Sequence, residues 1–212
     1  MVVTARTGSS DLPQMLVLQQ DSPRSNYKVW YTIAMLPGAK IPSVLPSDVG
    51  SAPVNATSLF LALSPRQLPK TYGDVIDNGA ASPSASLFDV SKDEFYQQLS
   101  ASQRAQKAAL KKASLTFKHS LGSDNIQALS TSDAGALVAV YMNDTYTIKP
   151  TKLGSAVTVS GNEKIMLGSN GSIRGVKSVY GDMLLFYVPA MSSKNQIRLL
   201  GVTQGLISVR GL

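Results

Sequence analysis

The fold is decided by residues 135–209, which run GALVAVYMNDTYTIK, SAVTVSG, GSIRGVKSVYG, DMLLFYVPA and NQIRLLGVTQGLISV. Each segment is rich in Val, Ile, Leu, Tyr and Thr, and each is bounded by Gly, Asn, Asp, Ser or Pro. This pattern predicts an antiparallel meander. A sheet of this kind buries one face against another element. The only long helical pattern in the chain lies just upstream and is the natural candidate.

This long helix is predicted over residues 91–114. Ser91 is placed to cap its first turn, and Glu94 is placed to reach back to the cap. Val90 can pack against Phe95 as a hydrophobic staple. One stripe of the helix is moderately apolar and contains small residues, which favours close approach to a sheet.

A shorter helix is predicted through TYGDVIDN, ending at Gly79 as a left-handed cap. Ser64 and Gln67 precede it in a capping-box pattern. Pro69 follows them, where it is expected to shorten or bend the helix.

Two features of the tail are interpreted as interruptions of its strands. Residues 161–175, GNEKIMLGSNGSIRG, lack the Gly-Lys-Ser/Thr ending of a phosphate loop and are interpreted as hairpin turns. Asn143 stands inside an otherwise continuous β pattern and predicts a bulge or bend there.

These patterns predict an α+β chain in three parts. Residues 1–42 are expected to be the C-terminal β-meander of an upstream, truncated domain, or else a hairpin packed on the main domain. Residues 43–56 are rich in Pro and are expected to be a linker. Residues 57–212 are expected to form a cone-like domain, with helices packed on a strongly curved antiparallel β-sheet. A β-sandwich with one helix is the alternative fold.

Two distant hairpin patterns resemble each other. Residues 15–19 align with 183–187, and 27–30 align with 197–200, with a Ser-containing basic loop between them in both cases. An internal repeat would make the start of the chain the end of one domain and the remainder a second copy. Chance similarity between two amphipathic hairpins is the alternative.

The composition limits both partners and chemistry. Twenty Lys and Arg against thirteen Asp and Glu give a formal net charge of +7, which would attract nucleic acid, anionic lipid or acidic wall polymer. The same charge also simply keeps a protein soluble. The absence of Cys excludes disulfides, thiol catalysis and Cys-ligated zinc. No apolar run approaches the roughly 20 residues that span a bilayer.

One basic stretch, residues 104–118, carries positive charges without any acid. An anionic membrane surface or wall polymer is the partner that this stretch favours. Nucleic acid is disfavoured because Phe117 is the only interleaved aromatic residue. A solvated charged face is the alternative. The candidate contact residues are Arg104, Lys107, Lys111, Lys112 and Lys118.

The sequence offers little catalytic chemistry. His119 is the only histidine, no Gly-x-Ser-x-Gly motif accompanies it, and it is expected on the surface or in strand packing. Asp74 and Asp77 can share a helix face, but they do not form the flanking pair of a glycosidase. One histidine and no cysteine argue against a transition-metal site. We therefore expect no catalytic residue, no cofactor and no metal.

Several segments together resemble a known family. They are YKVWYTIAMLPG with the Pro-rich linker after it, SP…YGDVIDNG, FDVSKDEF, GALVAVY and YVPA. They are similar to actinobacterial secreted proteins and lipoproteins of unknown function, whose domains resemble the cone-shaped fold of nuclear transport factor 2. The resemblance covers most of the chain and implies a cell-envelope location. This chain departs in lacking the polar acid–base pocket of enzymes with that fold, such as ketosteroid isomerase.

The lipobox cysteine of a lipoprotein is also missing from this sequence. The sequence opens MVVTAR, which is typical of the middle of a strand and not of a leader, so we expect a signal or anchor upstream of Met1. The expected function is that of a non-catalytic extracytoplasmic module, secreted or membrane-anchored, which binds or assembles with other domains of a longer protein. A cytosolic location fits the cysteine-free composition equally. The alternative function is a small-ligand carrier or enzyme that uses the hollow between helix and sheet. A pocket with converging polar groups would favour that alternative.

Overall fold

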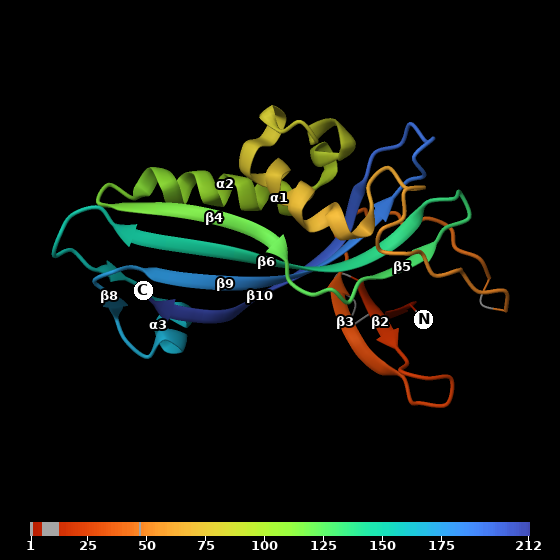
Figure 1. The fold of residues 1–212 in the computed structure, drawn as a ribbon, viewed down its shortest axis with the longest axis horizontal. Coiled ribbons are helices and arrows are strands. Elements are labelled where there is room, and N and C mark those ends of the chain that lie inside the picture. The colour runs from red at the N-terminus through yellow and green to blue at the C-terminus, as the bar shows by residue number, and fades with distance from the viewer. Residues whose placement is uncertain (1, 6–12, 47) are drawn as a thin grey trace.

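The computed structural model describes residues 2–5, 13–46 and 48–212. It confirms the predicted α+β arrangement, with helices packed against a large antiparallel sheet and a smaller β-sheet at the N-terminus (Figure 1). The α-helices of the described part are α1 (Leu68–Asn78), α2 (Glu94–Ala109) and α3 (Gly161–Leu167).

The main sheet has the strand order β10-β9-β6-β4, and β5 also pairs with β6. Its strands are β4 (Ala113–Leu121), β5 (Gln127–Ser130), β6 (Ala136–Pro150), β9 (Val176–Val188) and β10 (Arg198–Gly211). The expected bulge at Asn143 is wrong, because β6 keeps an unbroken register with both β4 and β9. Gly122 and Gly181 lie beside this part of β6 and leave room for its side chains. The register shifts of this sheet lie instead between β9 and β10.

Two smaller sheets flank the main one. The N-terminal strands form an antiparallel sheet in the order β1-β2-β3, and a short ribbon pairs β7 with β8. Their bounds are Val2–Ala5, Gln14–Gln19 and Lys28–Ala34 for β1 to β3, and Val157–Thr158 and Gly171–Ser172 for β7 and β8. Residues 1 and 6–12 of the expected N-terminal β-meander lie outside the described residues.

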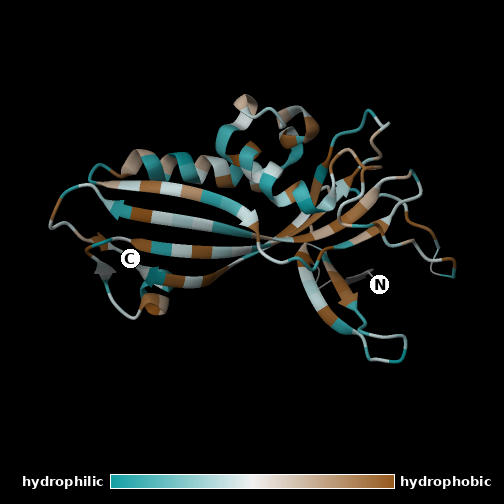
Figure 2. Ribbon diagram, in the orientation of Figure 1, coloured by the Kyte–Doolittle hydropathy of each residue, from teal (hydrophilic) through white to brown (hydrophobic). Residues whose placement is uncertain are grey.

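Both faces of the main sheet are covered near its middle. On one face, α1 and α2 pack against β6 and β9 through a cluster that includes Leu68, Tyr72, Val75, Leu99, Val138, Val140, Leu184 and Phe186. On the other face, the N-terminal sheet packs through Met15, Val17, Tyr31 and Ile33 against Leu137, Ala139, Leu185 and Leu200. Successive residues of β6 and β9 are therefore buried alike, as in strands covered on both sides. Figure 2 shows that hydrophobic and polar residues alternate farther along β4, β6 and β9.

The N-terminal sheet is also joined to the main sheet by backbone pairing. Met35 bridges to Gly201, and the Leu36 amide donates to the Leu200 carbonyl at 2.9 Å. The expected linker, residues 43–56, runs beside β5 and bonds to it through Ala52 and Val54. The division into an upstream fragment, a linker and a main domain stays a prediction.

Helix α2 begins later and ends earlier than expected. Its N-cap is Asp93, whose carboxylate accepts from the Tyr96 amide at 2.8 Å. Ser91 lies in a 3-10 turn, and its hydroxyl donates to Asp89 instead of capping the helix. The helix ends at Ala109 because Leu110 is extended and β4 starts at Ala113.

Helix α1 ends where it was predicted, with Gly79 as its C-cap, and the φ of 54° suits a residue without a side chain. The ψ of −130° lies outside the left-handed helical region, so the left-handed cap that was expected there is not formed. Pro69 does not bend it, because it lies in the first turn, where no intrahelical N–H is needed. The Ser64 hydroxyl bonds the Gln67 side chain and not a backbone amide, so the capping box is not formed.

The expected hairpin turns at residues 161–175 are partly wrong, because α3 occupies the first half of that segment. Ser160 precedes the helix with extended dihedral angles, and Gly168 ends it in the left-handed conformation with a φ of 70°. Its short length hides the helical period in the sequence. Beyond Gly175, the two strand patterns of the tail form one continuous strand, β9.

Candidate functional sites

A row of polar side chains crosses the helix-facing side of the main sheet. We call His119, Asp144, Asp182 and Gln204 the polar row. Strand register places His119 of β4 opposite Asp144 of β6, and Gln204 of β10 opposite Asp182 of β9. Asp182 itself lies opposite Met142, two positions from Asp144, so both carboxylates face the helices.

Helix α1 covers the β4 end of this row. His119 Nε2 lies 3.3 Å from Asp77 Oδ1, His119 Nδ1 lies 3.3 Å from Asp144 Oδ1, and the imidazole is 2% exposed. Gly73 permits this packing, because a Cβ there would collide with the His119 side chain. Asp74 is not part of the row, since its carboxylate accepts from Asn78 and Ser82.

Burial shifts the protonation equilibria of the row. It raises the pKa of Asp144 to about 6 and that of Asp182 to about 7, because an ionised carboxylate loses its hydration there. Gln204 Nε2 donates to Asp182 Oδ1 at 2.9 Å and partly offsets this pKa rise. Burial lowers the pKa of His119, but the carboxylates of Asp77 and Asp144 outweigh it and raise that pKa overall.

The row also concentrates unsatisfied polar atoms. In the described part, buried side-chain atoms without a hydrogen bond of good geometry include both nitrogens of His119, both oxygens of Asp144 and Asp182 Oδ2. Gln103 Nε2 of α2 is another. Such groups are few in folded proteins and mark sites that need an explanation. A cavity of about 290 Å³ adjoins the row, with Tyr146 and Gln204 in its wall.

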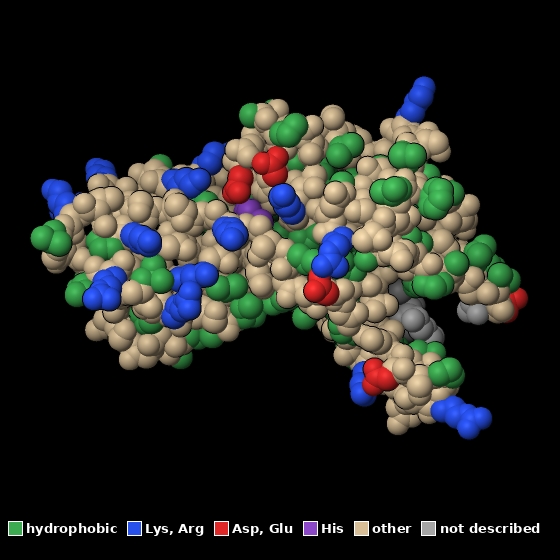
Figure 3. Space-filling view, viewed as in Figure 1, with side chains coloured by type: hydrophobic (Ala, Val, Ile, Leu, Met, Phe, Trp, Pro, Cys, Tyr) green, Lys and Arg blue, Asp and Glu red, His purple; other side chains and the backbone are tan. Residues whose placement is uncertain are grey.

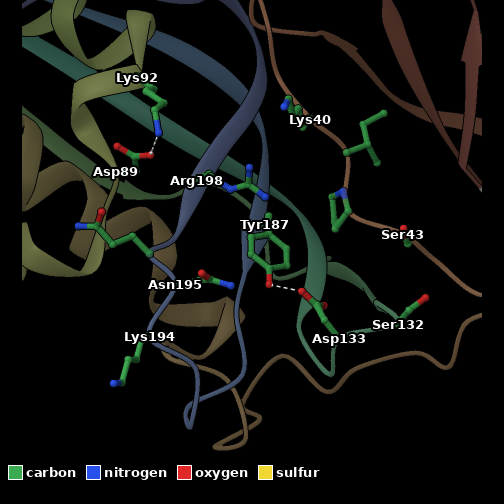
Figure 4. A pocket seen from close by; sticks show the side chains of 13 residues that line it. Lys40, Ser43, Asp89, Lys92, Ser132, Asp133, Tyr187, Lys194, Asn195 and Arg198 are labelled. Atoms are coloured by element: carbon green, nitrogen blue, oxygen red, sulfur yellow. Dashed lines mark hydrogen bonds and ion pairs between the residues drawn. The ribbon is translucent and has the colours of Figure 1, made fainter.

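A larger cleft lies where the N-terminal segment meets the ends of β9 and β10. Its volume is about 820 Å³, and Figure 4 shows that the side chains around it come from segments far apart in the sequence. We call it the Arg198 cleft. Its charged side chains are Lys40, Lys92, Lys194, Arg198, Asp89 and Asp133.

Both acids of the cleft are already engaged. Asp89 accepts from Ser91 at 2.8 Å and pairs with Lys92 at 3.2 Å. Asp133 accepts from the hydroxyls of Thr131 and Tyr187, each at 2.5 Å, and these bonds lower its pKa. The other charged groups of the cleft, Lys40, Lys194 and Arg198, are cations.

The candidate basic residues lie on one end of the molecule, all exposed. Arg104 and Lys107 are on α2, Lys111 and Lys112 are in the turn after it, and Lys118 is on β4. Lys107 Nζ lies 4.9 Å from the centre of the Phe117 ring. No ion pair joins any of these five to an acid within the described residues.

The fold adds further cations to them. Residues 104–118, 145–180 and 205–212 meet through the pairing of β4, β6, β9 and β10. Together they carry eleven Lys and Arg and a single carboxylate, Glu163. We call this surface the cationic end. Figure 3 shows Lys and Arg gathered on the left end of the molecule, while the acids visible in this view lie nearer its centre and right. The six cations that the sequence reasoning missed are Lys149, Lys152, Lys164, Arg174, Lys177 and Arg210.

Comparison with known families gives one match, to the model described as "Domain of unknown function (DUF8094)", over residues 1–211. The chain belongs to this family. Neither the comparison with curated proteins nor the comparison with solved structures gave a match. Among the described residues, no group of His, Asp or Glu is arranged to hold a metal ion, and no helix is long and apolar enough to cross a membrane.

Sequence reasoning considered Asp77 and His119 but assigned neither to a site, and it missed Asp144, Asp182 and Arg198. Asp144 and Asp182 each interrupt a strongly apolar strand, and a charged residue in such a position is a usable signal. Arg198 has no such signal, because the cleft around it is assembled from distant segments.

Proposed function

We propose that this protein is a non-catalytic extracytoplasmic module of a bacterial cell-envelope protein, and that it binds an anionic surface through its cationic end. The charge segregation carries the proposal: eleven cations share one end of the molecule with a single carboxylate. The other twelve acids lie elsewhere in the chain. A protein that was merely soluble and basic would have no need of such segregation.

Electrostatics and exposed apolar side chains together favour a lipid surface. Each Lys or Arg held near an anionic bilayer contributes about 1 kcal/mol within a Debye length of it. Leu153 is fully exposed at the cationic end, and Ile165 and Ile173 are 77% and 71% exposed. Such side chains among lysines suit insertion at a headgroup boundary, whereas a wall polymer offers them no apolar phase.

The same end is poorly suited to nucleic acid. Its strand aromatic Phe117 packs edge-on against Tyr146, with ring centres 4.7 Å apart, and Lys107 lies over it. The ring is therefore not free to stack on bases. The envelope location rests on the sequence resemblance, and fractionation of cells that express the full-length protein tests it.

Vesicle co-sedimentation tests the surface proposal. Vesicles of phosphatidylcholine with phosphatidylglycerol should retain the protein at low ionic strength, and pure phosphatidylcholine should not. Retention should fall steeply near 1 M salt, where the Debye length is about 3 Å. A soluble teichoic-acid polymer serves as the competing anionic partner.

Matched double variants provide the control. Lys111→Gln with Lys152→Gln should weaken retention by about thirtyfold, from about 1 kcal/mol for each of the two lost charges. Arg24→Gln with Lys70→Gln removes the same charge at exposed positions away from the cationic end. If both double variants lost the same amount of vesicle retention, net charge alone would explain the binding, and the proposal would be overturned.

A ligand site in the hollow between α2 and the sheet is the second candidate function. It is favoured by the unsatisfied atoms of the polar row beside a cavity. The cavity is near the lower limit of about 300 Å³ for ligand sites, and Phe95 and Leu99 take part in its lining. Native mass spectrometry of the purified protein tests it: a bound small molecule should be present and should be lost in Leu99→Trp, and an empty wild type would reject this function.

A further inference from the structure

The Arg198 cleft holds a guanidinium group in a fixed position. Arg198 begins β10 directly opposite Tyr187 of β9, and its guanidinium carbon lies 5.0 Å from the centre of the tyrosine ring. Tyr187 is itself fixed, because its ring is buried and its hydroxyl donates to Asp133. Cation–π contact with an immobile ring restricts the arginine without using its N–H donors.

Those donors are unused. In the described part of the chain, the Arg198 side chain makes no hydrogen bond and no ion pair, although it is only partly exposed. Lys40 and Lys194 likewise have no ion-pair partner there. Asp89 pairs with Lys92, and Asp133 accepts from two hydroxyls; Arg198 is near enough to help lower the pKa of Asp89, but neither carboxylate forms an ion pair with it.

We propose that the Arg198 cleft binds the anionic group of a small ligand, a carboxylate or a phosphate monoester, with Arg198 as its bidentate anchor. The planar guanidinium matches the paired oxygens of either group. Lys40 and Lys194 add charge at the rim, and Ser43, Ser132 and Asn195 offer further polar contacts, as Figure 4 shows.

The ligand has room for a body beyond its anionic group. A second cavity of about 430 Å³ shares Lys40, Lys92 and Arg198 with the cleft and continues past Leu36 and Leu199. The cleft alone is large enough for a typical small molecule. An anionic group bound at Arg198 can therefore direct an apolar portion toward the second cavity.

Isothermal titration calorimetry with simple probes tests the proposal. Inorganic phosphate, phenyl phosphate and benzoate are the anionic probes, and benzyl alcohol is the neutral one. We expect at least one of the anions to bind with millimolar or better affinity and benzyl alcohol not to bind. Phenyl phosphate against benzoate separates a phosphate ligand from a carboxylate ligand.

Variants assign the binding to Arg198. Arg198→Gln should weaken anion binding by about tenfold or more, and Arg198→Lys should weaken it by several-fold, because a point charge loses the bidentate geometry. Tyr187→Phe keeps the ring but removes the hydrogen bond to Asp133, so it should weaken anion binding less than either Arg198 substitution does. Circular dichroism confirms that each variant is folded, and Lys194→Gln replaces Arg198→Gln if that variant is not.

Arg174→Gln is the matched control, with the same charge change at an exposed position of the cationic end. It should leave anion affinity within about twofold. Absence of binding by all three anions, or an equal loss in Arg174→Gln and Arg198→Gln, would overturn the proposal. Vesicle retention does not depend on this cleft, so either proposal can fail without the other.

Discussion

At the scale of single residues, Gly73 controls how closely α1 approaches the sheet. A Cβ at this position would overlap the His119 side chain, which is held between two carboxylates and cannot yield easily. Gly73→Ala should therefore lower the free energy of unfolding by about 1–3 kcal/mol, as overpacking does, despite the better helix propensity of Ala. Urea denaturation measures the loss.

Lys70→Ala in the same helix is the control, since Lys70 is exposed and has no partner among the described residues. Its change should stay within about 0.5 kcal/mol. A Gly73→Ala variant as stable as the wild type would show that His119 can move aside.

The polar row predicts an unusual dependence of stability on pH. The folded protein binds protons at Asp144 and Asp182 more tightly than the unfolded chain does, since their pKa values are raised to about 6 and 7. Between the ordinary Asp pKa of about 4 and these values, the folded state holds more protons, so the free energy of unfolding falls as pH rises. The raised pKa of His119 acts in the same direction.

Urea midpoints at about pH 5 and about pH 8 should therefore differ, with the lower pH more stable by a few kcal/mol. Asp182→Asn removes one of the titrating groups and should flatten the dependence. Asp48→Asn, at an exposed position, should leave the slope unchanged. A steeper or unaltered slope in Asp182→Asn would contradict the assignment.

Sequence patterns could place His119 in a strand and Asp77 on a helix, but not their contact. That contact depends on which strands pair and on the small residue between the two elements. Neither is visible in local periodicity, which reports only which side chains share a face.

At the scale of elements, α2 is anchored by Asp93, which has two roles. One carboxylate oxygen caps the helix through the Tyr96 amide, and the other accepts from the buried Tyr72 hydroxyl of α1 at 2.6 Å. Asp93→Ala should cost about 1 kcal/mol for the cap and a further 1–3 kcal/mol for the stranded hydroxyl. Thermal or urea unfolding measures the sum.

A double-mutant cycle separates these two parts. Adding Tyr72→Phe to Asp93→Ala removes the unsatisfied hydroxyl and should recover part of the lost stability. Ser91→Ala should be nearly neutral, since Ser91 does not cap the helix. A large loss of stability in Ser91→Ala would show that Ser91 caps the helix, as the capping-box prediction had it.

The elements with strong periodicity were the ones that the sequence predicted well. The strands of the tail and the end of α1 at Gly79 agree with the structure, because alternation and a glycine after a helical pattern are local signals. The cap of α2 was misplaced by two residues because Asp93 and Ser91 both suit an N-cap. Helix α3 was missed because seven residues are too few to display a period.

At the scale of the whole molecule, the N-terminal sheet and the main sheet share one core. Trp30, the only tryptophan, lies in the N-terminal sheet with its ring centre 3.9 Å from that of Tyr31. Because Ile33 and Tyr31 pack directly onto Leu185 and Leu200, the two sheets should unfold together. Tryptophan fluorescence and far-ultraviolet circular dichroism should give coincident denaturation curves.

Ile33→Ala tests the shared core more strictly. Ile33 is fully buried, so the substitution should cost about 2–5 kcal/mol and shift both curves equally. Val29→Ala, at an exposed position of the same strand, should shift neither by much. A fluorescence transition that precedes the circular dichroism transition would show that the sheets are separate folding units.

The overall arrangement was only partly predictable. An α+β fold with an antiparallel tail follows from the patterns of Val, Ile and Leu, and the structure confirms it. The gathering of eleven cations at one end does not, because Lys149, Lys177 and Arg210 reach the basic residues after α2 only through strand pairing.

Strand β10 has a further consequence through its length. It carries Arg198 at its first residue and Arg210 near its last, and twelve steps of about 3.3 Å separate them by roughly 40 Å. A molecule resting on a membrane by its cationic end therefore presents the Arg198 cleft at a height of several Debye lengths. At that height the surface potential would no longer concentrate or repel anions, so under both proposals the strand would act as a spacer that lets the cleft sample ligands at their bulk concentration.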